Sequence, residues 1–201
     1  FKFNHTARLD IEGNGSLSAI GTADSLIKFL GSQETPGQWG GIRFKTTNPA
    51  NELTYTEISH GGANEYANVL VDYNGAVKIT HSLFTMSATF GLDIKADGEI
   101  QDFSANTFES DAGINIPANL IGVLDYESSY IGSDGTGTIS VFSGDVSNAQ
   151  SWPGVDAPYI VDGFIDIKEE VIVKPGATFK FNQNARLDIE GNGSLSAIGT
   201  A

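Results

Sequence analysis

Hydrophobic and polar residues alternate with a period of two in short runs, as in LDIE (9–12) and VKIT (77–80). Such alternation predicts β-strands in which every second side chain points into a core. No window carries the sustained i, i+3, i+4, i+7 spacing of a helix. Segments rich in Gly, Asn, Asp and Ser, such as EGNGS (12–16) and KADGE (95–99), predict turns every few residues. The pattern therefore indicates an all-β protein of short strands.

Apolar-x-apolar pairs recur in the middle of the chain at nearly equal intervals, and a second apolar series advances beside them by a similar step. Two registers that advance together predict a solenoid of stacked rungs, each with more than one strand. An antiparallel β-sandwich also has short strands, but it gives no reason for such a register and is less favoured. The first series is Val69, Val71, Leu92, Ile94, Ile114 and Ile116; the second is Ile58, Ile79, Phe84, Phe103 and Phe108.

The two ends of the chain carry nearly the same segment. Residues 1–23 and 179–201 match at all but two positions, with Phe179 in the place of Phe1. A cloned duplication would be identical, so the differences favour a parent protein of tandem 178-residue units. The start at Phe1, without Met or a signal peptide, fits a piece of a longer protein. The differing pairs are His5 and Gln183, and Thr6 and Asn184.

Composition narrows the possible partners. The chain has 25 acidic and 11 basic residues, a net charge of −14, and no cysteine. A strongly negative field repels phosphate backbones and anionic lipid, so we expect no nucleic-acid partner. No stretch is apolar enough to cross a bilayer, so we expect no membrane insertion. Without cysteine, the chain has no disulfide, thiolate zinc site or cysteine nucleophile.

Several blocks carry a family resemblance. They are Trp152 followed by Pro158-Tyr159, a V-x-P-G-x-x-x-K-F stretch at 173–181, a G-S-L-x-A-x-G-T-A strand at 15–23, a W-x-G-I strand at 39–42, and the segments VKITHSLF (77–84) and IQDFSANTF (100–108). Together they resemble the right-handed parallel β-helix (pectin-lyase-like) repeat regions of large bacterial extracellular or surface proteins.

This resemblance covers nearly the whole chain. It implies one single-stranded right-handed parallel β-helix domain over residues 1–201, with Asn106 at a turn. The spacing of about 22 residues per rung predicts about nine rungs for the 201 residues. The resemblance also implies a secreted or cell-surface location. It says little about chemistry, because the same fold serves lyases, hydrolases, adhesins and inert stalks.

An enzyme of this fold would gather carboxylates from adjacent rungs on one outer face, beside a cation or a basic side chain. The predicted outward columns stack no two carboxylates, and we interpret Asp93 with Lys95 as a solvated surface pair. The Asp-Asp, Gly-His-Gly and Arg-x-Lys motifs of polygalacturonases are missing, so we expect no catalytic residues. The columns are Leu70, Asp93 and Asn115, and Asp72, Lys95 and Pro117; the three arginines are Arg8, Arg43 and Arg186.

A calcium loop is the strongest candidate among metal sites. Asp10-x-Glu12-x-Asn14-Gly15 matches the first half of an EF-hand loop, but Gly21 stands where the bidentate carboxylate is required. We interpret the acidic residues as outward charges before an Asn-Gly turn, and GSDGTG (132–137) also as a turn. Whether calcium binds at either of these turns stays an open question, and no metal or cofactor is predicted. The copy consists of Asp188, Glu190, Asn192 and Gly193, with Gly199 at the last position.

His60 and His81 each lie two residues after an apolar position, Ile58 and Ile79, and are expected to stack on neighbouring rungs. Without a third ligand nearby, we interpret them as turn residues rather than a metal site.

Aromatic side chains could offer flat surfaces to sugar rings. Trp39 and Trp152 belong to the recurring blocks and are interpreted as packing residues, and the tyrosines select no single column. The tyrosines are Tyr55, Tyr66, Tyr73, Tyr126, Tyr130 and Tyr159.

The sequence thus predicts a non-enzymatic structural segment, a stalk, filament or adhesin repeat. Its expected partners are neighbouring repeats, or copies of itself, stacked end to end, together with surface glycans. The alternative is a polysaccharide-binding or polysaccharide-cleaving module.

Overall fold

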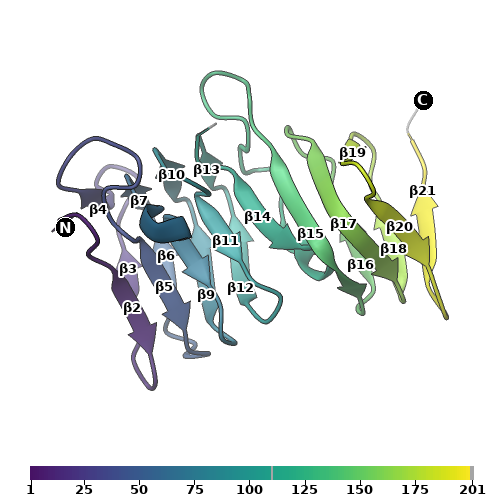
Figure 1. Ribbon diagram of the computed structural model, residues 1–201, viewed down its shortest axis with the longest axis horizontal. Coiled ribbons are helices and arrows are strands. Elements are labelled where there is room, and N and C mark those ends of the chain that lie inside the picture. The colour runs from purple at the N-terminus through teal and green to yellow at the C-terminus, as the bar shows by residue number, and fades with distance from the viewer. Residues whose placement is uncertain (110, 200–201) are drawn as a thin grey trace.

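The computed structural model describes residues 1–109 and 111–199, which form a parallel β-solenoid of about eight turns with the termini at opposite ends of its long axis (Figure 1). The predicted all-β solenoid is confirmed. The sequence predicted about nine rungs from the short, regular spacing of its central strands. Near the N-terminal end a turn is longer, since 33 residues separate Glu12 from its partner Lys45 in the next turn. Longer loops of this kind lower the number of turns.

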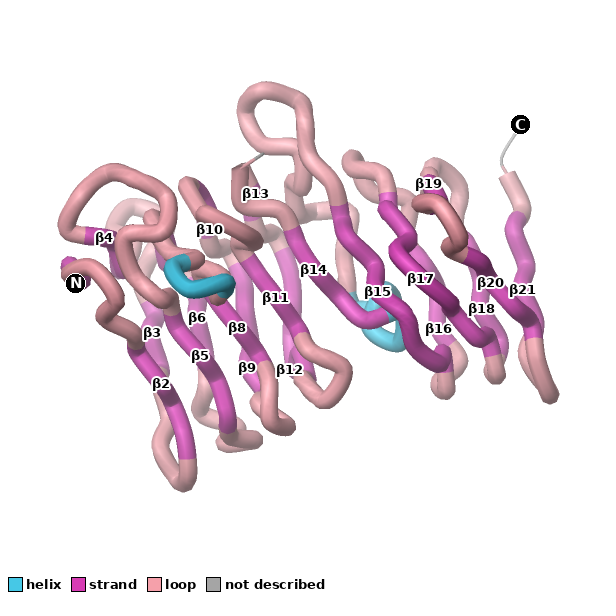
Figure 2. The backbone as a smooth tube through the Cα atoms, viewed as in Figure 1, coloured by secondary structure: helices cyan, strands magenta, loops and turns pink. Residues whose placement is uncertain are grey.

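The largest sheet has nine strands and extends along the whole molecule (Figure 2). In it Val69, Leu92 and Ile114 are direct neighbours, which confirms the predicted first register. Its strands are β2 (Leu9–Glu12), β5 (Ile42–Lys45), β8 (Val69–Val71), β11 (Leu92–Ile94), β14 (Ile114–Pro117), β15 (Ile139–Val146) and β17 (Tyr159–Ile167), with β19 (Phe179–Phe181) and β20 (Arg186–Ile189) both paired to β17.

Three smaller sheets form the other sides of the coil. The five-stranded sheet contains β1 (Lys2–Phe3), β4 (Ile27–Gly31), β7 (Thr56–Ser59), β10 (Leu83–Thr85) and β13 (Thr107–Phe108). The four-stranded sheet contains β3 (Ser18–Ile20), β6 (Glu52–Thr54), β9 (Ala76–Thr80) and β12 (Glu99–Ser104), and the three-stranded sheet contains β16 (Gln150–Trp152), β18 (Glu170–Val173) and β21 (Ser194–Ala197). In the part of the chain that the structure describes, two short 3₁₀ helices, η1 (Ala63–Glu65) and η2 (Ala118–Val123), join strands. No helix among the described residues is long and apolar enough to cross a membrane.

The core consists of apolar columns inside the coil. Phe84 stacks on Phe108 with ring centroids 4.5 Å apart, and Phe108 stacks on Tyr130 in the next turn at 5.9 Å. Trp39 and Trp152 are fully buried, which confirms that they are packing residues. Columns of this kind bury a continuous apolar surface from turn to turn.

One predicted column is wrong. Ile79 pairs with Phe103 as expected, but its partner in the preceding turn is Leu53, and Ile58 pairs with Phe84 instead. A single residue, Tyr55, separates β6 from β7, so Ile58 already lies on the next face of the coil. The sequence period did not reveal this tight corner.

The corner repeats in three successive turns. Tyr55, His81 and Ala105 have left-handed φ angles of 51°, 52° and 53°, which bend the chain within one residue. Buried polar residues follow these bends and are hydrogen-bonded from turn to turn. The backbone amide of Ser82 donates to Asn106 Oδ1 at 3.0 Å, and the backbone amide of Asn106 donates to Ser128 Oγ at 2.8 Å. Asn106 therefore lies at a turn, as predicted.

Candidate functional site

The outer face of the nine-stranded sheet carries alternating charges near the N-terminal end. Lys45 Nζ on β5 lies 2.6 Å from Glu12 Oε2 on β2. Arg43 donates from Nε and Nη2 to Asp72 at 2.5–3.1 Å, and the two side chains are only 14% and 10% exposed. The hydrogen bond to Asp72 raises the pKa of Arg43, and the hydrogen bond to Glu12 raises the pKa of Lys45. These charges neutralise one another across adjacent turns.

The predicted pair of Asp93 and Lys95 is present, but its solvation was predicted wrongly. Asp93 is 4% exposed, with Lys95 Nζ at 2.6 Å and the Asn115 amide donating at 2.8 Å. Lys95 and Asn115 cover the carboxylate although it points outward. The predicted column of Leu70, Asp93 and Asn115 is confirmed in the same place.

Two tyrosines join this charged face. The guanidinium carbon of Arg43 lies 5.6 Å from the Tyr66 ring centre and 5.0 Å from that of Tyr73. Tyr73 is 63% exposed and lines a hollow of about 200 Å³ with Asp72, Lys95 and Asp97. An exposed aromatic ring beside charged groups is a surface on which a small polar ligand can rest.

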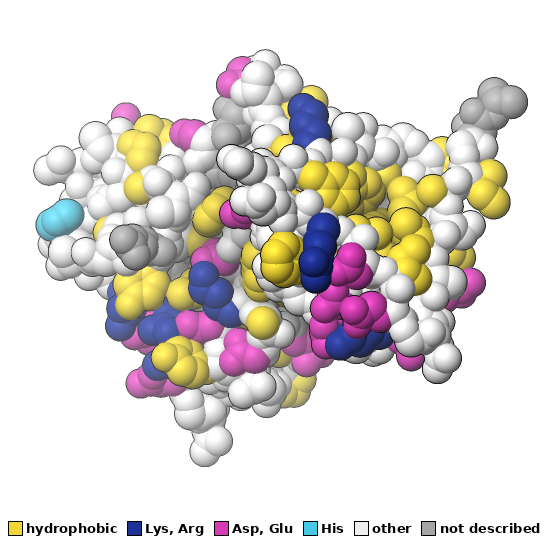
Figure 3. Space-filling view, turned by 45° about the vertical axis from the view of Figure 1, so that its right-hand side comes forward, with side chains coloured by type: hydrophobic (Ala, Val, Ile, Leu, Met, Phe, Trp, Pro, Cys, Tyr) yellow, Lys and Arg dark blue, Asp and Glu magenta, His cyan; other side chains and the backbone are white. Residues whose placement is uncertain are grey.

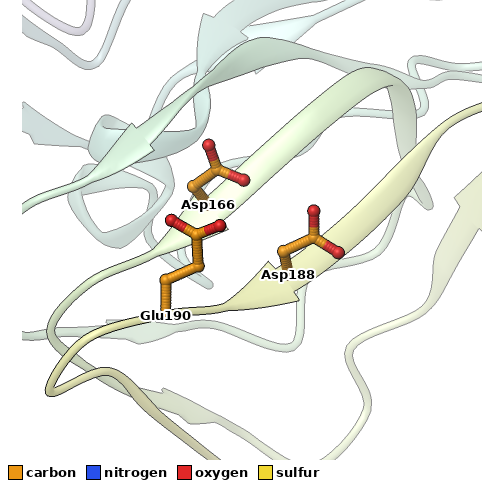
Figure 4. A group of neighbouring side chains, drawn as sticks. All are labelled: Asp166, Asp188 and Glu190. Atoms are coloured by element: carbon orange, nitrogen blue, oxygen red, sulfur yellow. The ribbon is translucent and has the colours of Figure 1, made fainter.

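Three carboxylates gather near the C-terminal end. Asp166 on β17 pairs in register with Asp188 on β20, and Glu190 follows β20 directly. One carboxylate oxygen from each lies within 4.8 Å of the others, and Figure 4 shows the three side chains on the same side of the two strands. We call Asp166, Asp188 and Glu190 the acidic cluster. Asp145 pairs with Asp166 one turn earlier, so three aspartates share one outward column.

Basic side chains engage part of this column. Lys168 Nζ lies 2.6 Å from Asp145, and Arg186 Nε lies 2.7 Å from Asp188. Within the part of the chain that the structure describes, the acidic cluster is the one group of three potential ligands close enough to share an ion. Oxygen donors of this kind suit a hard cation such as Ca²⁺. Glu190 is exposed, however, so water also solvates the cluster without any ion.

Asp188 and Glu190 belong to the second copy of the half EF-hand motif, but the sequence did not predict that Asp166 and Asp145 lie beside them, because the predicted columns ended at Asn115 and Pro117. The signal that could have revealed the two aspartates is the triplet apolar-Asp-apolar, which occurs at 165–167 and again one turn later at 187–189.

The half EF-hand motif forms outward charges before a turn, as predicted. Asp10 accepts a hydrogen bond from Arg8 at 2.7 Å, and Glu12 is paired with Lys45. Gly13 has a φ of 64°, and the Gly15 amide donates to the Glu12 carbonyl at 3.1 Å, which closes the turn. The two carboxylates therefore point to cationic side chains rather than into the loop.

The segment at 132–137 also forms a turn, as predicted. Asp134 Oδ1 accepts hydrogen bonds from the amide and the hydroxyl of Thr136 at 2.9 and 2.8 Å. Gly132 and Gly135 have φ angles of 60° and 71°. An aspartate that bonds two residues onward is typical of an Asx turn.

The predicted stacking of His60 and His81 is wrong. His60 follows β7 and is buried, whereas His81 follows β9 and lies at a different corner, with its ring centre 4.6 Å from that of Tyr55. The error follows from the Ile58 register. Burial lowers the pKa of His60.

The remaining tyrosines divide by burial. Tyr130 and Tyr159 are buried, and their hydroxyls donate to the carbonyls of Asp125 and Pro153 at 2.9 Å. Burial raises the pKa of both phenols well above the usual range. Tyr126 is exposed on a loop.

Family models, curated proteins and solved structures were compared with the chain, and none of them matches. The fold itself therefore defines the class: the chain is a parallel β-solenoid.

Proposed function

We propose that the chain is a non-enzymatic structural segment of an exported bacterial surface protein, a stalk, filament or adhesin repeat that forms a rigid rod. The observation that carries the proposal is the repeat of one segment, with matching left-handed turns, at both ends of the solenoid. β2 and β3 correspond to β20 and β21, and the turn glycines Gly13 and Gly191 have φ angles of 64° and 58°. A following repeat could continue the coil without a change of path.

The rod has a calculable length. Seven successive strand pairings lead from β2 to β20 along the nine-stranded sheet. At about 4.8 Å per pairing, one repeat adds roughly 34 Å. Electron microscopy of proteins with two, three and four repeats should show unbroken rods that lengthen by this amount. Separate beads with variable spacing of roughly 60 Å or more would contradict the rod.

The non-enzymatic part of the proposal has its own test. Much of the outer charge is engaged in pairs such as Lys45 with Glu12, which favours structural use. Assays for new reducing ends and for unsaturated uronides should show no turnover on bacterial and plant polysaccharides. Turnover that disappears in Asp166→Asn would instead support the polysaccharide-cleaving alternative.

One observation favours glycan binding as a second candidate function. Tyr73 is exposed beside the hollow formed with Asp72, Lys95 and Asp97. A glycan array should then show binding that Tyr73→Ala abolishes and that Tyr126→Ala retains, since Tyr126 is 81% exposed on a separate loop. Equal signals from both variants would remove this candidate.

A further inference from the structure

The repeated segment presents the same side chains in two environments. Among the described residues, β2 is paired with β5 of the following turn alone, and β20 with β17 of the preceding turn alone. Ile11 is 5% exposed, but its counterpart Ile189 is 53% exposed. The turn that follows the repeated segment therefore buries the isoleucine, whereas the turn that precedes the segment leaves it exposed.

The same contrast holds at the other strand of the segment. Ala19 on β3 is buried beside β6, whereas its counterpart Ala197 on β21 is exposed. The Leu17 amide donates to Asn51 Oδ1 in the covering turn at 3.1 Å. Residues up to 54 thus complete the cover over the N-terminal copy.

The charges follow this contrast too. Glu12 is bonded to Lys45 of the covering turn, and Asp10 lies opposite Arg43 in register. Their counterparts Glu190 and Asp188 lie beside another carboxylate, Asp166, although Asp188 keeps the ion pair with Arg186 that Asp10 makes with Arg8. Figure 3 shows acidic side chains together with basic ones, next to hydrophobic side chains, on the part of the molecule that is turned forward.

We propose that this end, formed by β20, β21 and the acidic cluster, is a docking face for a segment with the sequence of residues 24–54, the start of a following repeat. The inference rests on the proposed rod and names the partner and the groups that recognise it. In the docked arrangement the arginine and lysine that correspond to Arg43 and Lys45 lie over Asp188 and Glu190. Apolar cover and opposite charges then coincide on one face, as they do over the N-terminal copy.

The docking face also disfavours direct stacking of the first turn of a second, identical molecule. A second molecule that placed its first turn on the last turn of this chain would bring Asp10 over Asp188 and Glu12 over Glu190. Like charges directly opposite each other on neighbouring strands destabilise the pairing. The acidic cluster therefore favours a turn with the sequence of residues 24–54 over a second copy of the repeated segment, residues 1–23.

The test uses the full chain extended by a second copy of residues 24–54. Amide exchange is measured at Leu195, whose counterpart Leu17 serves in every sample as an internal reference for folding. We expect the extension to slow exchange at Leu195 by about tenfold or more. Lys45→Glu in the appended copy should remove most of this protection, and Lys28→Glu in the appended copy should leave it unchanged. Lys28 is the matched control because it carries the same charge change and contacts Glu57, which lies outside the appended segment.

The outcomes separate the two proposals. Equal protection with Lys45→Glu and with Lys28→Glu would overturn recognition by charge and leave the rod intact. No protection at Leu195 in any extended chain, while Leu17 stays protected, would overturn the docking face and the continuous rod together.

Discussion

Replacing Thr6 with Asn should stabilise the protein. Thr6 has a φ of 66°, in the left-handed region, and Asn184 has the same angle at the same place in the second copy. A left-handed conformation raises the energy of an ordinary residue by about 1–2 kcal/mol, and a β-branched side chain is among the least tolerant, whereas Asn adopts it readily. Thr6 is exposed, so few contacts change. We expect Thr6→Asn to raise the free energy of unfolding by about 1 kcal/mol.

The chain provides its own reverse experiment and control. Asn184→Thr should lower the free energy of unfolding by a similar amount, and His5→Gln, the other position at which the copies differ, should change it by less than about 0.5 kcal/mol. Urea unfolding with unchanged m-values gives all three numbers. If Thr6→Asn is neutral or destabilising, the left-handed conformation of Thr6 does not lower the stability of this turn.

Three further predictions concern buried groups. Asn106→Ala should lower the free energy of unfolding by about 2–4 kcal/mol in urea, because it removes the side-chain partner of the buried Ser82 backbone amide and of the Ile79 carbonyl, both in the preceding turn. Ile94→Ala should lower the free energy of unfolding by about 2–5 kcal/mol and Asp93→Ala by about 1–3 kcal/mol. A negligible effect of Asp93→Ala would contradict the role given to its buried carboxylate, which is bonded to Lys95 and Asn115. Stability should fall as the pH rises above about 10, since the unfolded chain then loses phenolic protons that Tyr130 and Tyr159 keep in the fold. Replacing both by Phe should flatten this alkaline decline in unfolding experiments.

The middle of the fold could be predicted because its turns have nearly constant length. Val69, Leu92 and Ile114 follow one another at nearly equal steps along the chain, and alternation alone places them inward. Ile58 was misplaced because a corner of one left-handed residue leaves no Gly or Pro in the sequence to mark it. His60 and His81 were misplaced with it.

The direction in which a side chain points could be predicted better than its exposure to solvent. Asp93 points outward as its strand position requires, yet Lys95 and Asn115 bury it. Alternation reports which side of the sheet a residue occupies, but cover depends on which long side chains lie in the neighbouring turns. The copies of one segment differ in exposure although their sequences agree, because a following turn covers the first copy and none covers the second among the described residues.

The outer columns of the solenoid can vary without disturbing the core, because inward and outward residues alternate along each strand. Near the N-terminal end, acidic and basic residues face each other in successive turns, whereas near the C-terminal end Asp145, Asp166 and Asp188 share one column. Lys168 and Arg186 already offset part of this acidic charge in the isolated chain. Under the proposed docking, a following repeat brings further basic residues to the end of the column. The inward residues then set the spacing of the turns, and the outward charges determine which turn follows.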